Sequence, residues 1–175
     1  MMDARSRAAR IKLMVFDIDG VMTDGGLHYT DDGRELKTFH VHDGLGLKLM
    51  QRAGIDMAIV TGRTSGVVLA RAADLGIVHV FQGVANKRAA VEELIARLGL
   101  HWPEVGFMGD DFIDLPAMLQ CGFAVAPANA HPLVKERSHA VTDASGGRGA
   151  VREAVEFVLA AQGKLDALFA SYLEL

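Results

Sequence analysis

Two aspartates at the end of a short apolar stretch are the residues of this chain best suited to chemistry. Residues 13–16 read Leu-Met-Val-Phe, and Asp17, Asp19 and Gly20 follow within four positions. Four consecutive apolar residues are typical of a strand buried on both faces. If the strand continued, both carboxylates would lie on one side, about 6–7 Å apart at about 3.3 Å per residue. Buried like charges need compensation, which indicates a metal ion or an acid–base division of labour. The alternative is a surface turn, where Asp and Gly are also common.

Polar residues also follow other apolar stretches of the chain. Ligands of open α/β sheets bind at the carboxyl ends of the strands, so we expect these side chains to converge with the aspartate pair. They are Thr61, Gly62 and Arg63 after residues 55–60, Lys87 at the start of a helix expected at 86–98, and Asp110, Asp111 and Asp114 after residues 105–108.

The elements that must position these residues alternate along the chain. Apolar stretches indicate strands, and segments of helical period that end in glycine indicate helices between them. This alternation predicts an α/β fold, a Rossmann-like parallel sheet with helices on both faces. Residues 25–41 alternate around Asp31-Asp32-Gly33 and predict a β-hairpin inserted after the first strand. The strands are expected at 13–16, 55–60, 77–81, 105–108, 122–125 and 139–141, and the helices at 43–53, 64–75, 86–98, 114–120 and 149–161.

Composition limits the class of protein. A length of 175 residues with 50% hydrophobic and 23% charged residues predicts one globular domain over residues 1–175, with an apolar tail at about 163–175. The net charge of -4 argues against nucleic-acid binding. No apolar run is long enough to span a membrane, and the arginine-rich start lacks the apolar segment of a secretory signal. The lone Cys121 excludes an intrachain disulfide, so we expect a core thiol in a cytoplasmic protein.

The order of the polar motifs is more specific than any one of them. Over about 100 residues this order resembles the haloacid dehalogenase-like phosphohydrolase superfamily. It runs from Asp-x-Asp-Gly to a strand that ends in Thr-Gly, then to a lysine at the start of a helix, and last to Gly-Asp-Asp-x-x-Asp. The resemblance implies that Asp17 is the nucleophile and Asp19 the general acid and base. It implies a Mg²⁺ site made by the side chains of Asp17 and Asp110 and the backbone carbonyl of Asp19. Thr61 and Lys87 would bind the phosphoryl group, and Asp111 and Asp114 would orient the metal's waters and the lysine.

Further motifs indicate one family within this superfamily. The chain resembles the 3-deoxy-D-manno-octulosonate 8-phosphate phosphatases from Ile11 to about Leu165. The resemblance rests on Asp-x-Asp-Gly-Val-x-Thr-Asp-Gly, the hairpin, residues 39–46 and the Gly-Gly-Arg-Gly-Ala-Val-Arg-Glu segment at 146–153. That resemblance implies hydrolysis of this sugar-acid phosphate in lipopolysaccharide biosynthesis. It also implies a homotetramer in which the hairpin and a neighbouring subunit replace a cap domain.

The substrate of that family carries a carboxylate as well as a phosphate. Arginine binds carboxylates through paired hydrogen bonds, so Arg63 is a candidate for the sugar acid, with Gly62 and Asp43 beside the site. Arg148 is a second candidate in a glycine-rich segment expected to be mobile, although it is equally consistent with an ordinary loop arginine.

Three alternatives remain open from the residues. A nine-carbon nonulosonate 9-phosphate is a different substrate for the same chemistry, and a non-catalytic oligomerisation module is a different class of protein. Phosphomutase or phosphonatase chemistry on the same core is the third, and it normally needs a larger cap, for which this sequence shows no insertion. His40 and His42, at i and i+2, raise a zinc site, but no third and fourth ligand has diagnostic spacing. In the tail, Phe169 and Tyr172 are expected to be apolar docking residues.

Overall fold

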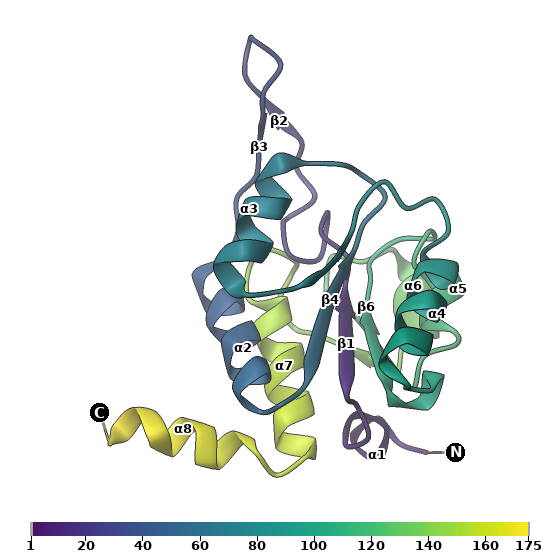
Figure 1. Cartoon of the computed structure of the whole chain (residues 1–175), viewed down its shortest axis with the longest axis vertical. Coiled ribbons are helices and arrows are strands. Elements are labelled where there is room, and N and C mark those ends of the chain that lie inside the picture. The colour runs from purple at the N-terminus through teal and green to yellow at the C-terminus, as the bar shows by residue number, and fades with distance from the viewer. Residues whose placement is uncertain (1, 175) are drawn as a thin grey trace.

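A six-stranded parallel sheet forms the centre of the molecule. The computed structural model describes residues 2–174, and its strand order is β5-β4-β1-β6-β7-β8. The central β1 pairs in parallel with β4 on one side and β6 on the other (Figure 1). The predicted parallel α/β sheet is therefore confirmed. The strands are β1 (Leu13–Phe16), β4 (Asp56–Val60), β5 (His79–Phe81), β6 (Val105–Met108), β7 (Phe123–Ala126) and β8 (Ala140–Val141).

Helices cover both faces of the sheet, as the sequence predicts. Alternate side chains of β1 face opposite cores: Met14 and Phe16 belong to one, Leu13 and Val15 to the other. The two groups of helices lie on opposite sides of the strands in Figure 1. The first core is closed by α1 (Ala4–Ala8), α2 (Val41–Arg52), α3 (Gly66–Leu75) and α7 (Ala150–Ala161), and the second by α4 (Lys87–Leu98), α5 (Leu115–Met118) and α6 (Pro132–Arg137).

The inserted hairpin extends away from the sheet. Its strands β2 (His28–Tyr29) and β3 (Glu35–Leu36) pair antiparallel and form the narrow projection at the top of Figure 1. The hairpin is confirmed, but its paired part is much shorter than residues 25–41. The expectation that His40 and Val41 continue the strand is wrong, because α2 begins at Val41 with His40 as its N-terminal cap residue. The histidine pair therefore lies at a helix start.

Short elements account for most of the differences from the sequence prediction. The helices α1 and α6 and the 3₁₀ turn Trp102–Glu104 have too few residues to show a helical period. The apolar tail forms a separate helix, α8 (Leu165–Leu173), which projects from the body of the molecule (Figure 1). No helix among residues 2–174 combines the length and apolar character needed to cross a membrane.

Candidate active site

Most of the site residues predicted from the sequence line one pocket at the carboxyl ends of the central strands. The pocket has a volume of about 160 Å³. It receives residues from the loops after β1, β4 and β6, because these strands are neighbours in the sheet. Its lining is Asp17, Asp19, Thr61, Gly62, Arg63, Asp110, Asp111 and Ile113. Of these, only Ile113 has no motif in the sequence that would mark it.

Lys87 is buried next to the pocket and joins the carboxylate of Asp17, which lines it, to that of Asp114, which does not. Its ammonium is 2.8 Å from Asp17 Oδ1 and 2.7 Å from Asp114 Oδ1. Asn86 caps α4 by accepting a hydrogen bond from the Ala89 amide, which fixes Lys87 in the first turn of the helix. Burial opposes the lysine's charge, but the two carboxylates outweigh it and raise the pKa of Lys87. Lys87 is therefore a fixed cation beside Asp17.

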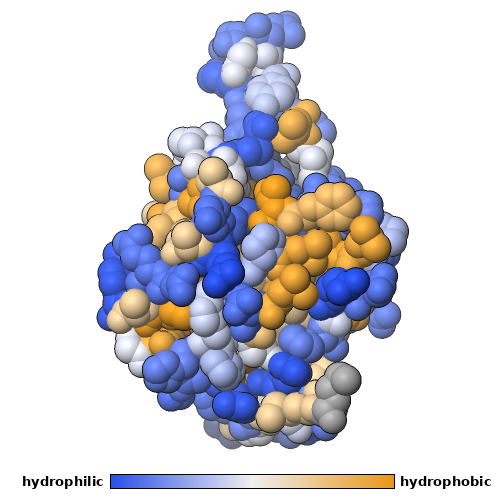
Figure 2. Space-filling model, turned by 90° about the vertical axis from the view of Figure 1, so that its right-hand side faces the viewer, coloured by the Kyte–Doolittle hydropathy of each residue, from blue (hydrophilic) through white to orange (hydrophobic). Residues whose placement is uncertain are grey.

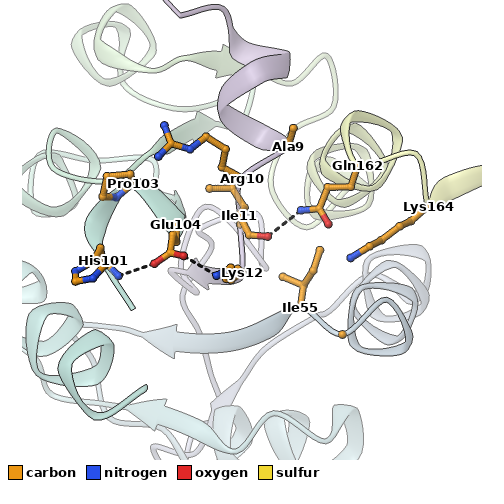
Figure 3. A pocket seen from close by; sticks show the side chains of 11 residues that line it. Ala9, Arg10, Ile11, Lys12, Ile55, His101, Pro103, Glu104, Gln162 and Lys164 are labelled. Carbon is orange, nitrogen blue, oxygen red and sulfur yellow. Dashed lines mark hydrogen bonds and ion pairs between the residues drawn. The ribbon is translucent and has the colours of Figure 1, made fainter. Parts of the chain in front are cut away.

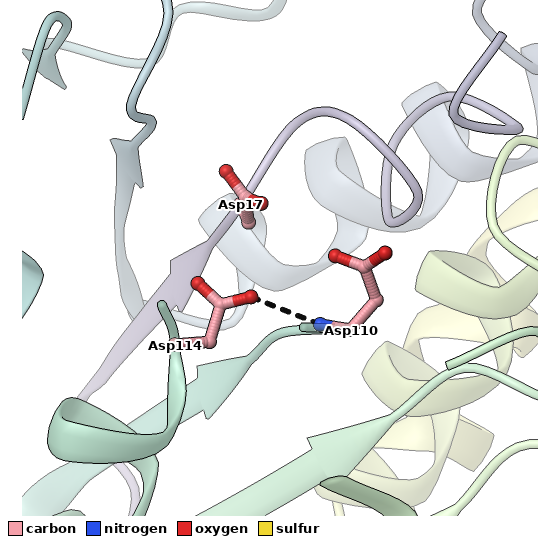
Figure 4. Close-up of side chains that lie close together, drawn as sticks. All are labelled: Asp17, Asp110 and Asp114. Atoms are coloured by element: carbon pink, nitrogen blue, oxygen red, sulfur yellow. Dashed lines mark hydrogen bonds between the residues drawn. The ribbon is translucent and has the colours of Figure 1, made fainter. Parts of the chain in front are cut away.

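Asp114 uses both of its oxygens to shape the loop after β6. Oδ1 accepts from Lys87, while Oδ2 accepts from the amides of Asp110 at 3.0 Å and Asp111 at 3.2 Å. These bonds fold the Gly-Asp-Asp turn back over the start of α5. Figure 4 shows the bond to the Asp110 amide and the side chains of Asp17, Asp110 and Asp114 pointing toward one another.

The aspartate cluster has the donor atoms of a cation site. Oxygens of Asp17, Asp110 and Asp114 lie within 4.8 Å of one another, the one such group of three or more metal-type ligands among residues 2–174. Burial, helped by the neighbouring Asp114 charge, raises the pKa of Asp17 to about 6 and of Asp110 to about 7. Asp17 Oδ1 is buried and accepts no hydrogen bond of good geometry, although Lys87 is near. A divalent cation held by Asp17 and Asp110 would relieve this excess of negative charge.

Gly20 makes room for this cluster. Its φ is +87°, and a Cβ there would overlap the Asp110 carboxylate. The glycine of the Asp-x-Asp-Gly motif therefore both turns the chain and lets the loop after β1 approach the loop after β6.

Asp19 has surroundings unlike those of Asp17. The pairing of β1 ends at Phe16, so the strand spacing expected for the two aspartates does not apply. The Asp17 side chain is 6% exposed, whereas the Asp19 side chain is 21% exposed and pairs with Lys37 from the hairpin. The two carboxylates of the motif are thus held by different cations.

The predicted substrate residues divide into three groups. Arg63 reaches the pocket, donating to Tyr29 Oη at 2.7 Å and Glu35 Oε1 at 3.2 Å, with 43% of its side chain exposed. Arg148 is 72% exposed and lies 3.8 Å from Asp24 Oδ2, outside the pocket lining. Asp43 is not brought to the pocket: its carboxylate accepts from the Arg152 amide at the start of α7.

The glycine-rich segment before α7 is held close to the loop after β1. The Gly147 amide donates to Val21 O at 3.1 Å, and Gly146 donates to the Asn129 side chain. A Cβ on Gly146 would overlap the Gly20 carbonyl. Gly146 and Gly147 thus permit close backbone contact with the loop after β1, and the mobility expected of this segment on ligand binding stays a prediction.

A larger groove lies at the other end of the sheet but has no such chemistry. It measures about 760 Å³ and is lined by residues around the start of β1 and the end of α7 (Figure 3). Its polar groups bind one another: Lys12 pairs with Glu104 at 2.7 Å, and Gln162 donates to Ile11 O at 2.8 Å. These contacts fasten the N-terminal segment to the body.

Comparisons with known proteins agree with the site. Residues 72–154 match the haloacid dehalogenase-like hydrolase family. The 3-deoxy-D-manno-octulosonate 8-phosphate phosphatase KdsC of Yersinia pestis is 46% identical over 164 residues, covering 94% of this chain and 88% of the relative. The KdsC of Escherichia coli K12 is 44% identical over 94% of this chain and 87% of its own length.

Solved structures match as closely. The crystal structure of the Yersinia pestis phosphatase superposes with a TM-score of 0.92, at 46% identity over 94% of this chain and 89% of that one. The Moraxella catarrhalis phosphatase, solved with a magnesium ion, a phosphate ion and KDO, gives a TM-score of 0.95 at 40% identity and 97% coverage of both chains. This chain therefore belongs to the 3-deoxy-D-manno-octulosonate 8-phosphate phosphatase family of haloacid dehalogenase-like hydrolases.

Proposed function

We propose that this protein is a Mg²⁺-dependent phosphatase that hydrolyses 3-deoxy-D-manno-octulosonate 8-phosphate to the free sugar acid and phosphate, a step toward lipopolysaccharide. The observation that carries the proposal is Asp17, buried between Lys87 and the Asp110 carboxylate in a family whose members bear this activity in their names. The magnesium and KDO bound by the Moraxella catarrhalis relative support the choice of metal and sugar acid.

The residues of this chain catalyse the hydrolysis in two half-reactions. Asp17 attacks phosphorus and forms an aspartyl-phosphate as the bond from phosphorus to the sugar oxygen breaks, while Asp19 gives its proton to that oxygen. Asp19 then takes a proton from water, which attacks phosphorus and releases Asp17. Thr61 and Lys87 bind the phosphoryl oxygens, and Asp114 keeps Lys87 and the Asp110–Asp111 turn in place.

The metal would be held by the carboxylates of Asp17 and Asp110 and the backbone carbonyl of Asp19, with Asp111 and Asp114 orienting its waters. When bound, Mg²⁺ neutralises phosphate charge and lets an anionic nucleophile approach an anionic substrate.

The sugar carboxylate is assigned to Arg63, with Gly62 beside it in the pocket and Arg148 as a further contact. Support for Arg63 comes from its place in the pocket lining and its partly open side chain. Support for Arg148 is that it lies on the segment packed against the loop after β1, 3.8 Å from Asp24 Oδ2. Support for Asp43 is weaker, because its carboxylate binds the α7 backbone.

The first experiment is phosphate release from a panel of sugar phosphates, with Mg²⁺ and with excess chelator. We expect strong, metal-dependent preference for the eight-carbon sugar-acid phosphate. Preference for a nine-carbon nonulosonate 9-phosphate would change the substrate and keep the chemistry. No release from any member of the panel would contradict the phosphatase and favour the non-catalytic oligomerisation module.

We also propose that the protein is a cytoplasmic homotetramer built from a single domain of residues 1–175. Apolar side chains gather on the side of the molecule that carries α4–α6 (Figure 2), where Phe112, Ile113, Leu119 and Leu133 are all exposed. The buried free thiol of Cys121 is consistent with a reducing compartment. Sedimentation equilibrium tests the assembly, since a monomer would contradict it, and cell fractionation tests the location.

A further inference from the structure

The hairpin partly buries charged side chains, although the parallel sheet does not require charged residues there. Glu35, Lys37 and Phe39 are partly buried, while Leu36 and Thr38 between them are exposed. The Lys37 side chain is only 2% exposed, although most of the hairpin around it is in solvent. A buried ammonium loses hydration and gains no packing advantage over an apolar side chain, so its place calls for a specific partner.

That partner is the carboxylate of Asp19. Lys37 Nζ pairs with Asp19 Oδ1 and lies 3.3 Å from Glu35 Oε1. Glu35 Oε1 is 3.2 Å from Arg63 Nη2, and Arg63 Nε is 3.6 Å from Asp19 Oδ2. We call these four residues, Asp19, Lys37, Glu35 and Arg63, the hairpin ion ring. Two cations and two carboxylates alternate in it and join the hairpin to the loops after β1 and β4.

The two carboxylate oxygens of Asp19 have different contacts within the hairpin ion ring. Oδ1 accepts a charge-assisted hydrogen bond from Lys37, the strongest kind available to a carboxylate. Oδ2 accepts no hydrogen bond from the described residues, since Arg63 Nε at 3.6 Å is too far. Lys37 therefore fixes the rotation of the carboxylate, and Oδ2 is the oxygen left to exchange a proton.

We propose that Lys37 is a positioning residue for Asp19, and that the hairpin thereby orients the acid and base of the reaction. This inference rests on the function proposed above. In the first half-reaction the proton on Oδ2 passes to the leaving sugar oxygen as its bond to phosphorus breaks and the Asp17–phosphorus bond forms. In the second, a water oxygen binds phosphorus, its proton passes to Oδ2, and the Asp17–phosphorus bond breaks.

Single-turnover kinetics with two substrates test this role. The sugar-acid phosphate needs a proton on its leaving oxygen, whereas 4-nitrophenyl phosphate releases a stable phenolate that does not. Lys37→Met should slow the first turnover of the sugar-acid phosphate at least about tenfold, and that of the aryl phosphate less than about twofold. The aryl phosphate should then show a burst of nitrophenol followed by a slow steady state, because water activation also depends on Asp19.

Two further variants complete the comparison. Lys37→Arg keeps the charge and should recover part of the lost rate. Arg34→Met removes an exposed hairpin cation that pairs with Asp32, and should behave as wild type. If Lys37→Met does not fold, the double variant Lys37→Met/Glu35→Gln removes one charge of each sign from the hairpin ion ring and supports the same measurement.

Equal slowing of both first turnovers, or no slowing with the sugar-acid phosphate, would overturn the positioning role and leave the phosphatase intact. A wild-type protein inactive toward both substrates would instead overturn the proposed function, and the role of Lys37 with it.

Discussion

At the scale of residues, hydrogen bonding distinguishes Asp17, Asp19 and Asp114, which all belong to similar acidic motifs in the sequence. Asp114 accepts bonds at both oxygens, so it cannot also take part in chemistry without undoing the turn that it holds. Asp17 keeps a buried oxygen without a hydrogen bond of good geometry, and Asp19 keeps Oδ2. Asp17 Oδ1 has an ion pair with Lys87, and Asp19 Oδ2 has a 3.6 Å contact with Arg63, so each oxygen keeps room for a further partner that the mechanism requires.

Asp17→Asn should abolish turnover, to below about one thousandth of the wild-type rate, because an amide cannot form the aspartyl-phosphate. The variant should fold normally, since it removes one charge from an overly negative cluster. Phosphate release and circular dichroism melting check both expectations. Asp31→Asn at the exposed hairpin turn is the matched control, and activity retained in Asp17→Asn would remove this residue as the nucleophile.

Arg63→Ala should raise KM for the sugar-acid phosphate about tenfold or more, because it removes the paired contact to the carboxylate that we propose for this residue. The effect on 4-nitrophenyl phosphate, which has no carboxylate, should be much smaller. Steady-state kinetics on both substrates measure the difference. Equal losses on both would assign Arg63 to the phosphate, or to the hairpin ion ring alone.

At the scale of elements, the loop after β1 is fixed from two directions. The loop after β6 approaches it at Gly20, and the segment before α7 approaches it at Gly146 and Gly147. Each approach depends on the absence of a side chain. The loop that carries Asp17 and Asp19 is therefore supported by two segments distant in the sequence, each of which approaches it at a glycine.

Gly146→Ala should destabilise the protein by about 1–3 kcal/mol, because its Cβ would overlap the Gly20 carbonyl and backbone must move. Activity should fall as well, since the moving backbone carries the Asp-x-Asp-Gly motif. Urea unfolding with activity assays checks this. Gly66→Ala is the control, because nothing lies within 4 Å of a Cβ there; equal free energies of unfolding in the two variants would contradict the packing role.

The sequence predicts local features of these elements well and their mutual contacts poorly. Strands such as 13–16 and 105–108 are predicted at their observed bounds, because the first ends directly at Asp17 and the second at Gly109, just before Asp110. Asp43 and Lys37 show the limit. Asp43 belongs to the 39–46 motif but binds α7, while Lys37 belongs to no motif but binds Asp19. Charged residues at i and i+2 on the inward side of a short strand were the available signal for Lys37.

At the scale of the whole molecule, the aspartate cluster ties stability to pH and to divalent cations. Burial holds the pKa of Asp17 near 6 and of Asp110 near 7, above the ordinary aspartate value. The folded state therefore keeps protons that the unfolded chain has already lost. The cluster's contribution to stability is greatest below about pH 4 and is lost as pH rises toward about 7.

Without divalent cation, wild type should lose more of its free energy of unfolding between about pH 5 and pH 7.5 than Asp110→Asn does, because the variant removes one titrating group. Mg²⁺ should reverse the trend, stabilising the protein more at about pH 7.5 than at pH 5, since it competes with protons for the same oxygens. Thermal melts in chelator and in Mg²⁺ at both pH values provide the comparison. A Mg²⁺ effect independent of pH, or unchanged in Asp110→Asn, would contradict the assignment of the metal to this cluster.

The helices α1 and α8, which carry the two ends of the chain, both lie at the end of the molecule away from the hairpin (Figure 1). A label attached to a side chain of either helix therefore lies at the opposite end of the strands from the pocket. In the protomer, such a label leaves the loops after β1, β4 and β6 unobstructed.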